Sequence, residues 1–185
     1  MTGPVYGIAK VHEVGSVEDR LALIAKQVDV SVRDPWTRAL ALEIVSQTPQ
    51  HGDGLEAGEI TSVFYWVKNN IQYRQDPRDY DLYATAKRTV QLGGGDCDDV
   101  TILVTALLSN LGYRIGAKTI SPDGKNWHIY PVVAYHTKSN PKLICTLDTT
   151  QPDSAPGWEP PMAYRRKEIR TAFAGGEAFN EKVRG

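Results

Sequence analysis

The sequence predicts an α+β fold in which helices come first along the chain and an antiparallel sheet follows. Apolar residues recur at helical spacing as far as Leu111, whereas short apolar and β-branched runs between turn residues follow from Tyr113. The 185 residues, 41% of them hydrophobic, suffice for one core without disulfide or metal staples. We expect a single domain over residues 1–185, with a core at about 56–150, an N-terminal helical extension at 1–55 and a C-terminal tail at 151–185.

Five helices are expected from apolar spacing and from residues that favour helix ends. They cover residues 16–30, 34–47, 56–70, 85–92 and 97–111. Ser16 and Asp34 can cap the first two helices, and Pro35 suits a first helical turn. Gly112 is the natural end of the fifth helix, which begins at Cys97 and is apolar through most of its length.

Three strands of a small antiparallel sheet are expected next. They are Arg114–Ile120, Ile129–Tyr135 and Leu143–Leu147, separated by turns at 122–124 and 139–141. The charged segment Gln72–Leu82 is expected to be irregular. The prolines of the tail favour coil wrapped on the domain, although residues 163–173 could form one further helix.

The charge pattern excludes two classes of partner. The formal net charge is −1 and the 21 basic residues are scattered, so the chain does not offer the long positive surface that nucleic acid requires. No stretch approaches about 18 consecutive apolar residues, and residues 1–4 do not resemble the start of a signal peptide. We expect a soluble cytoplasmic protein that binds neither nucleic acid nor membrane.

The two cysteines lie in very different surroundings. Cys145 belongs to the apolar run Lys142–Leu147, where a small buried thiol is expected. Cys97 lies in the polar, glycine-rich turn Gly93–Asp99 and begins a helix. The positive end of a helix dipole favours the thiolate, which is the nucleophilic form of cysteine. Cys97 is therefore the candidate nucleophile.

The acids around Cys97 require a cation nearby. Asp96, Asp98 and Asp99 would raise the pKa of the thiol by repulsion, so either an imidazolium or a metal ion has to oppose them.

The candidates for the imidazole are His12, His51, His128 and His136. The first two lie in weakly patterned N-terminal segments. If the strands on either side of Ser139 form a hairpin, His128 comes close to Asp148, while His136 lies at the turn, roughly 25 Å away. Asp148 can therefore orient only His128.

These residues resemble the bacterial transglutaminase-like cysteine proteinases, within the wider superfamily that includes papain-like folds. The resemblance covers about residues 63–150. It rests on Val67–Tyr73, Asp76, Asp81, Thr85, Gly93–Asp99, Leu107, Leu108, Leu111, Gly112, His128 and Leu147-Asp148. The family implies that Cys97 opens the core helix, and that His128 and Asp148 complete a catalytic triad on adjacent strands.

The chain also departs from the family pattern. Val100-Thr101 follows the acidic pair, where the family commonly has an aromatic residue or alanine, and the first 55 and last 35 residues have no recognised counterpart. Some relatives bind calcium through the acids flanking the cysteine, which corresponds here to Asp96 and Asp98. The alternative for the acids is helix N-capping by Asp96, with Asp98 and Asp99 favoured in the first turn by the dipole.

Several residues are candidates to line the cleft. The backbone N–H of Cys97 can stabilise an oxyanion. Gln72 or Tyr73 could supply a second donor, although a buried structural tyrosine is the alternative for Tyr73. Trp127 could wall the cleft beside His128, or simply pack in the core.

The expected function is hydrolysis of an amide bond in a protein or peptide through a thioester, which needs no cofactor. If a lysine amine replaces water, the same residues make a protein-crosslinking transglutaminase, and a peptide or glycan amidase is a related possibility. The alternative of another class is a phage virion or tail-associated assembly module, with a virion location.

Overall fold

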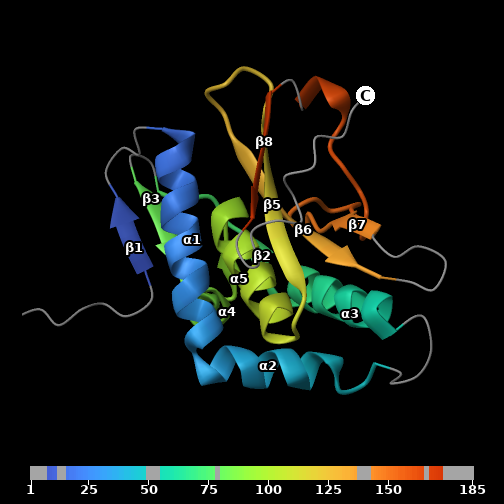
Figure 1. Cartoon of the computed structure of the whole chain (residues 1–185). Helices are drawn as coiled ribbons and strands as arrows, with labels where there is room; N and C mark the ends of the chain where they lie inside the picture. Colours follow the sequence, from blue (N-terminus) through green and yellow to red (C-terminus); the bar gives the residue numbers. More distant parts are fainter. Residues whose placement is uncertain are drawn as a thin grey trace, which may run out of the picture.

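The computed structural model describes residues 8–11, 16–48, 55–77, 80–136, 143–164 and 167–172. Figure 1 shows helices gathered around one central helix, with a sheet against one side of it. The order of helices first and antiparallel sheet second is confirmed, and the fold is α+β.

The five expected helices are present. They are α1 (Val17–Arg33), α2 (Pro35–Val45), α3 (Leu55–Asn70), α4 (Ala86–Leu92) and α5 (Cys97–Asn110). Ser16 caps α1 by accepting from the N–H of Asp19, and Asp34 caps α2 by accepting from the N–H of Trp36 at 2.9 Å. Within the described ranges, no helix is long and apolar enough to cross a membrane.

The main sheet has four strands in the order β7-β6-β5-β8, and each strand is antiparallel to its neighbours. The strands are β5 (Arg114–Ser121), β6 (His128–Tyr135), β7 (Leu143–Thr146) and β8 (Lys167–Ala172). The first three match the expected strands closely. The turn expected at residues 139–141 lies outside the described residues.

The fourth strand corrects the expectation for the tail. The described residues of this range, 163–164 and 167–172, form no α-helix: a short 3₁₀ helix at Met162–Tyr164 precedes β8, which pairs with β5 in the register Lys118↔Arg170. Without this pairing, the free edge of β5 would leave backbone N–H and C=O groups unpaired. Because β5 and β8 lie far apart in the sequence, the local pattern of apolar residues cannot predict that they pair.

Two small ladders lie in or beside the segment that was expected to be irregular. β3 (Asp81–Ala84) pairs antiparallel with β1 (Ile8–Val11), and β2 (Gln72–Tyr73) pairs parallel with β4 (Gly94–Gly95). The second ladder fixes the turn that leads to Cys97. The segment is therefore partly ordered into strands, contrary to the prediction.

The glycines of this turn are needed for two reasons: a left-handed backbone conformation at Gly93, and close approach of other atoms at Gly94 and Gly95. Gly93 has a φ of 62°, the left-handed conformation that ends α4. A Cβ on Gly94 would lie 2.8 Å from the carbonyl oxygen of Gln72, and a Cβ on Gly95 would lie 2.6 Å from the Asp99 side chain. Protein atoms therefore occupy the space where Gly94 and Gly95 lack a side chain.

Helix α5 is the centre of the core. Its residues from Asp99 to Leu108 are all buried, and it packs against α1, α2, α3, α4, β5 and β6. Truncating a buried leucine to alanine costs about 2–5 kcal/mol because it leaves a cavity. Cys97 is thus the first residue of a helix whose body is fully buried.

We predict that Gly95→Ala destabilises the protein by about 1–3 kcal/mol, because the new methyl group overlaps the Cβ and carboxylate of Asp99. Chemical denaturation measures the change in the free energy of unfolding. Gln91→Ala, at an exposed position on α4, is the matched control and should change this free energy by less than about 0.5 kcal/mol. Equal stability of the two variants would contradict the crowding argument.

Candidate active site

Three elements bring Cys97, His128 and Asp148 to one place. Cys97 is the first residue of α5, His128 is the first residue of β6, and Asp148 follows the end of β7. The hairpin register Val132↔Thr146, continued by the bond from Leu147 N–H to the Pro131 carbonyl, carries Asp148 alongside the start of β6. His128 Nε2 lies 2.7 Å from Asp148 Oδ2.

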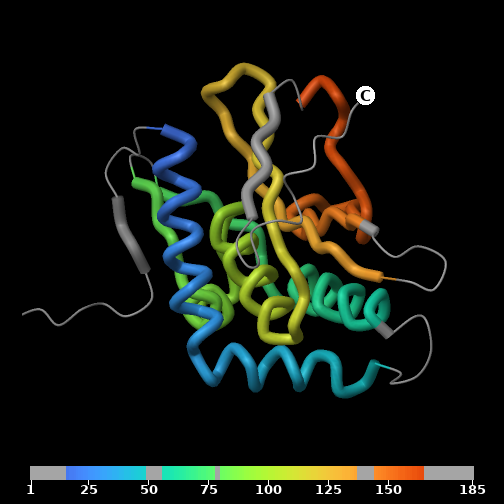
Figure 2. Tube along the Cα trace, in the orientation of Figure 1, coloured from blue at the N-terminus to red at the C-terminus, as the bar shows by residue number. Residues whose placement is uncertain are grey.

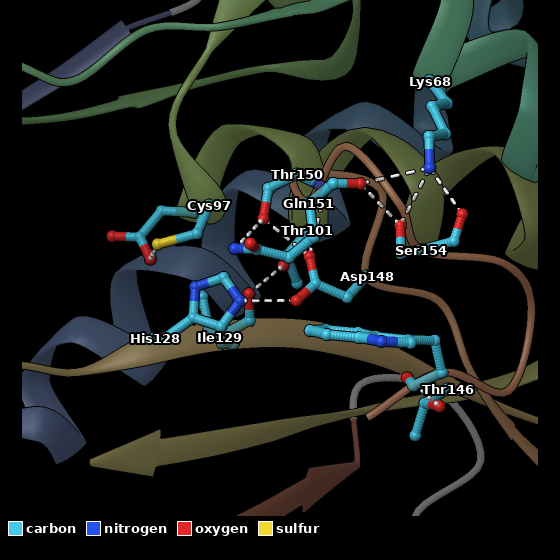
Figure 3. A network of polar contacts seen from close by, with 12 residues as sticks. Lys68, Cys97, Thr101, His128, Ile129, Thr146, Asp148, Thr150, Gln151 and Ser154 are labelled. Atoms are coloured by element: carbon cyan, nitrogen blue, oxygen red, sulfur yellow. Dashed lines mark hydrogen bonds and ion pairs between the residues drawn. The ribbon is translucent and has the colours of Figure 1, made fainter. Parts of the chain in front are cut away.

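The imidazole ring lies between the thiol and the carboxylate. In Figure 3, Nε2 of His128 faces Asp148 and the opposite edge of the ring faces the Cys97 side chain. The backbone N–H of Ile129, next to His128, hydrogen-bonds the Cys97 sulfur and lowers the pKa of the thiol against the stronger effect of burial. The start of β6 therefore meets the start of α5 at the sulfur.

Asp148 is held by more than the histidine. It is 1% exposed, and its Oδ1 accepts hydrogen bonds from the Thr150 hydroxyl at 2.6 Å and the Thr150 N–H at 3.1 Å. Burial would raise the pKa of Asp148, but the hydrogen bond and charge of His128, together with Thr150, hold it below its usual value. The carboxylate is therefore ionised at neutral pH and fixed in orientation.

The surroundings of Cys97 oppose its ionisation. Burial, then the charges of Asp98 and Asp96, raise the pKa of the thiol well above its usual value. The guanidinium of Arg20 on α1 is the main influence that lowers the pKa of Asp98, although burial and the charge of Asp81 raise that pKa overall. The thiolate thus needs a cation beside it, as the sequence predicted.

The acids around Cys97 also have structural partners. Asp96 Oδ1 accepts from the N–H groups of Asp98 at 2.9 Å and Asp99 at 3.3 Å, which is an N-cap of α5. Asp99 Oδ1 accepts from the N–H of Ala84 at 2.7 Å and so ties β3 to α5. Asp81, on β3, pairs with Arg20 at 3.0 Å.

One group of potential metal ligands occurs among the described residues. Single donor atoms of Asp96, Cys97 and Asp98 lie within 4.8 Å of one another. The carboxylate oxygens are the hard ligands that calcium prefers, and their crowded negative charge suits a divalent cation. Two of the three donors are such oxygens and the third is the soft sulfur of Cys97, while the N-cap made by Asp96 is observed.

Two pockets meet at Trp127. The first, which we call the acidic pocket, has a volume of about 440 Å³ and is lined by Arg20, Tyr73, Gln75, Asp76, Pro77, Tyr80, Asp81, Asp96, Cys97, Asp98 and Trp127. The second, the aromatic pocket, has a volume of about 520 Å³ and is lined by Ile120, Pro122, Asn126, Trp127, His128, Gln151, Trp158, Pro160, Pro161 and Tyr164. Cys97 lies in the first pocket and His128 in the second.

The structure separates the residues expected to line the cleft. Trp127 walls both pockets. Tyr73 lines the acidic pocket and is 49% exposed, so the alternative of a buried structural tyrosine is wrong. Gln72 does not line the acidic pocket. Its Oε1 accepts a hydrogen bond from Arg74 Nη2 at 3.0 Å. The β2–β4 ladder fixes the backbone that carries both side chains.

The tail supplies cleft residues that sequence reasoning missed. Trp158 and Tyr164 line the aromatic pocket, and Figure 2 shows the segment after β7 rising toward the β5–β6 turn. The Thr146 hydroxyl donates to the carbonyl of Trp158 at 2.8 Å, which anchors this segment. The available signal was the density of prolines and aromatic residues soon after Asp148.

Comparison with known proteins identifies a family and a shared fold. The family model described as the transglutaminase-like superfamily matches residues 38–137, more than half of the chain. The matched range includes Cys97 and His128 and ends before Asp148. No curated protein sequence matches the chain.

Two solved structures are similar to this one. A putative protease from Parabacteroides distasonis ATCC 8503 has a TM-score of 0.55 at 11% identity, covering 89% of this chain and 30% of that one. A putative cysteine protease from Cytophaga hutchinsonii has a TM-score of 0.48 at 15% identity, covering 78% of this chain and 49% of that one. The first similarity shows the fold, and this chain spans less than half of either protein.

We predict that Asp99→Asn raises the stability of the protein increasingly as the pH rises from about 4 to about 8. Burial, and then the charge of Asp76, raise the pKa of Asp99 to about 7 against the hydrogen bond from Ala84. The folded state therefore binds this proton more tightly than the unfolded state, and stability falls as pH rises between the two pKa values. An asparagine keeps the acceptor oxygen and removes the charge.

Melting curves of both proteins across this pH range test the prediction. At pH 8 the stabilisation should reach the order of 1–4 kcal/mol, and at pH 4 it should nearly vanish. Asp153→Asn, at an exposed position in the tail, is the control and should show little change at either pH. A difference between wild type and Asp99→Asn that does not depend on pH would contradict this account.

Proposed function

Since the chain belongs to the transglutaminase-like superfamily, we propose that it is a cysteine hydrolase that cleaves an amide bond through a thioester on Cys97. His128 serves as the base and later the acid, and Asp148 orients the ring. The observation that carries the proposal is the 2.7 Å contact of His128 Nε2 with an ionised, buried Asp148, with the other edge of the ring toward the thiol. A protein or peptide is the proposed substrate.

The chemistry follows from the positions of these groups. Nδ1 of His128 takes the thiol proton, and the resulting imidazolium is stabilised by Asp148 on its far side. The thiolate attacks the carbonyl carbon of the substrate. The N–H of Cys97, in the first turn of α5, is the proposed oxyanion donor, since the N–H groups of Asp98 and Asp99 already bind Asp96.

Collapse of the tetrahedral intermediate breaks the carbon–nitrogen bond. His128 gives its proton to the departing amine, and the acyl group remains on Cys97 as a thioester. Water activated by the neutral imidazole then hydrolyses it. A crosslinking transglutaminase would replace this water by a lysine amine, and analysis of the acyl products separates the two outcomes. Association with a phage virion remains a prediction that rests only on the resemblance to the family.

We predict that p-nitrophenyl acetate acylates Cys97 and leaves Cys145 unmodified. Both thiols have pKa values raised by burial, but only Cys97 has His128 beside it to accept the proton. Peptide mapping by mass spectrometry locates the acyl group. His128→Ala should slow acylation by about a hundredfold or more, and Cys97→Ala should abolish it.

Cys145→Ala is the matched control and should acylate at the wild-type rate. Acylation of Cys145 in the native protein, or an undiminished rate in His128→Ala, would overturn the proposed function. Circular dichroism melting of Cys97→Ala checks that its fold is kept.

We also propose that calcium binds Asp96 and Asp98 and counters the negative charge around the thiol. The support is the donor set of hard oxygens and the raised pKa of both acids, which burial and the charges of neighbouring acids cause. Bound calcium would supply a positive charge near Cys97 and so favour the thiolate. Asp96 would retain its role as the cap of α5.

Millimolar calcium should therefore raise the melting temperature relative to a chelator, since binding to the folded state alone stabilises it by about 2.7 kcal/mol at a hundredfold excess over the dissociation constant. Asp98→Asn should lose most of this shift, whereas Asp153→Asn should keep it. Identical melting curves with calcium and with chelator would leave these acids with their structural roles only.

A further inference from the structure

The catalytic pair is divided between two pockets of opposite character. The acidic pocket contains Cys97 and four carboxylates, whereas the aromatic pocket contains His128. Among the residues that line the aromatic pocket, none is a carboxylate, lysine or arginine. Trp127 forms the wall between them. A substrate across the reacting groups therefore meets a polar, charged surface on one side and an apolar one on the other.

The chemistry of amide cleavage determines on which side of the cleft the leaving-group part of the substrate lies. The departing amine receives its proton from His128, so its nitrogen has to lie within hydrogen-bond reach of that ring. The residue that carries this amine then extends to the side of the cleft that His128 lines. That side is the aromatic pocket.

We infer that the aromatic pocket binds the leaving-group residue of the substrate and selects an aromatic or large apolar side chain there. This inference rests on the proposed function. Trp127 and Trp158 offer ring faces for stacking, and Pro160 and Pro161 add flat apolar surface. The volume of about 520 Å³ accommodates one such residue. A charged side chain would lose its hydration without gaining an ion pair from these walls.

The pocket is built before any substrate arrives. Gly157 donates its N–H to the carbonyl of Thr146 at 2.8 Å, and the Thr146 hydroxyl returns a bond to the carbonyl of Trp158. Next in the chain, Glu159 forms an ion pair with Lys118, a β5 residue whose side chain is 8% exposed. Because these bonds fix the segment on both sides of the indole, little ordering is needed on binding.

Competition between different amines for the acyl-enzyme tests whether the aromatic pocket binds the leaving-group residue. This experiment does not require the natural substrate. Acetylation by p-nitrophenyl acetate gives the Cys97 thioester and releases p-nitrophenolate. An amine that attacks the thioester must enter where the leaving amine departs, by microscopic reversibility. Its nitrogen bonds to the carbonyl carbon, its proton passes to His128, and the carbon–sulfur bond breaks to restore the thiolate.

The full chain is acetylated in the presence of equal concentrations of the amides of phenylalanine, alanine, lysine and glutamate, and the acetylated products are quantified. We expect the phenylalanine product to exceed the alanine product by about tenfold or more, and the charged amides to react least. Equal yields, or a preference for a charged amide, with acylation of Cys97 intact would overturn this inference alone. Absence of acylation would count against the proposed function.

Variants locate the preference in the pocket. Trp158→Ala should reduce the phenylalanine to alanine ratio to about threefold or less, and Trp158→Phe should restore most of it. Tyr65→Ala removes an exposed tyrosine on α3 and should leave the ratio unchanged. An unchanged ratio in a folded Trp158→Ala protein would overturn the assignment.

A second measurement is independent of acylation. In Cys97→Ala protein, tryptophan fluorescence follows the binding of phenylalanine amide and alanine amide. Phenylalanine amide should bind about tenfold more tightly, and Trp158→Ala in the same background should remove the difference. Equal affinities would overturn the inference even if the acyl-enzyme never forms.

Discussion

The first turn of α5 is the constraint on which the rest of the structure depends. The body of this helix is buried on all sides, yet its first residues carry the thiol and three carboxylates. Each carboxylate near Cys97 is tied to a particular partner: Asp96 to the N–H groups of its own helix, Asp99 to the N–H of Ala84, and Asp98 electrostatically to Arg20. The helix, β3 and α1 are therefore arranged around one cluster of buried carboxyl groups.

This arrangement sets the electrostatic condition for the proposed catalysis. Burial and the neighbouring acids both favour the neutral thiol, so activation depends on positive charge supplied from other elements. Asp148 prepares His128 for this role from one side, because its carboxylate is ionised and held by Thr150. Arg20 belongs to the N-terminal extension, which had no recognised counterpart in the family; it pairs with Asp81 and lowers the pKa of Asp98 beside the thiol. The extension is thus part of the active-site environment.

The sequence predicts the parts of the fold that follow from local pattern. Helix α5 and its cap follow from apolar spacing behind Asp96, and the proximity of His128 and Asp148 follows from the hairpin register. Strand β8 could not be found in this way, since it is defined by the free edge of β5, far away along the chain. The glycines before Cys97 were correctly singled out, but Asp99 and the β2 backbone explain two of them.

The positions of side chains in the cleft were less predictable for a related reason. Tyr73 and Gln72 are neighbours in one strand, where successive side chains point to opposite faces, so only one can line the same pocket. Their position in the sequence therefore does not reveal whether Gln72 or Tyr73 lines the pocket. Trp158 and Tyr164 become cleft residues only because hydrogen bonds to β7 and an ion pair to β5 hold the tail in place.

The division of the cleft at Trp127 bears on the choice between hydrolysis and acyl transfer. In the proposed mechanism, the pocket that the amine leaves is also the route by which the next nucleophile reaches the thioester. An aromatic pocket stabilises a leaving group while the bond breaks, but an apolar surface gives water few partners once that group has gone. An amine with an apolar side chain would occupy the same surface favourably and compete with water. In the proposed mechanism, the tail that builds this pocket therefore influences whether water or an amine completes the reaction.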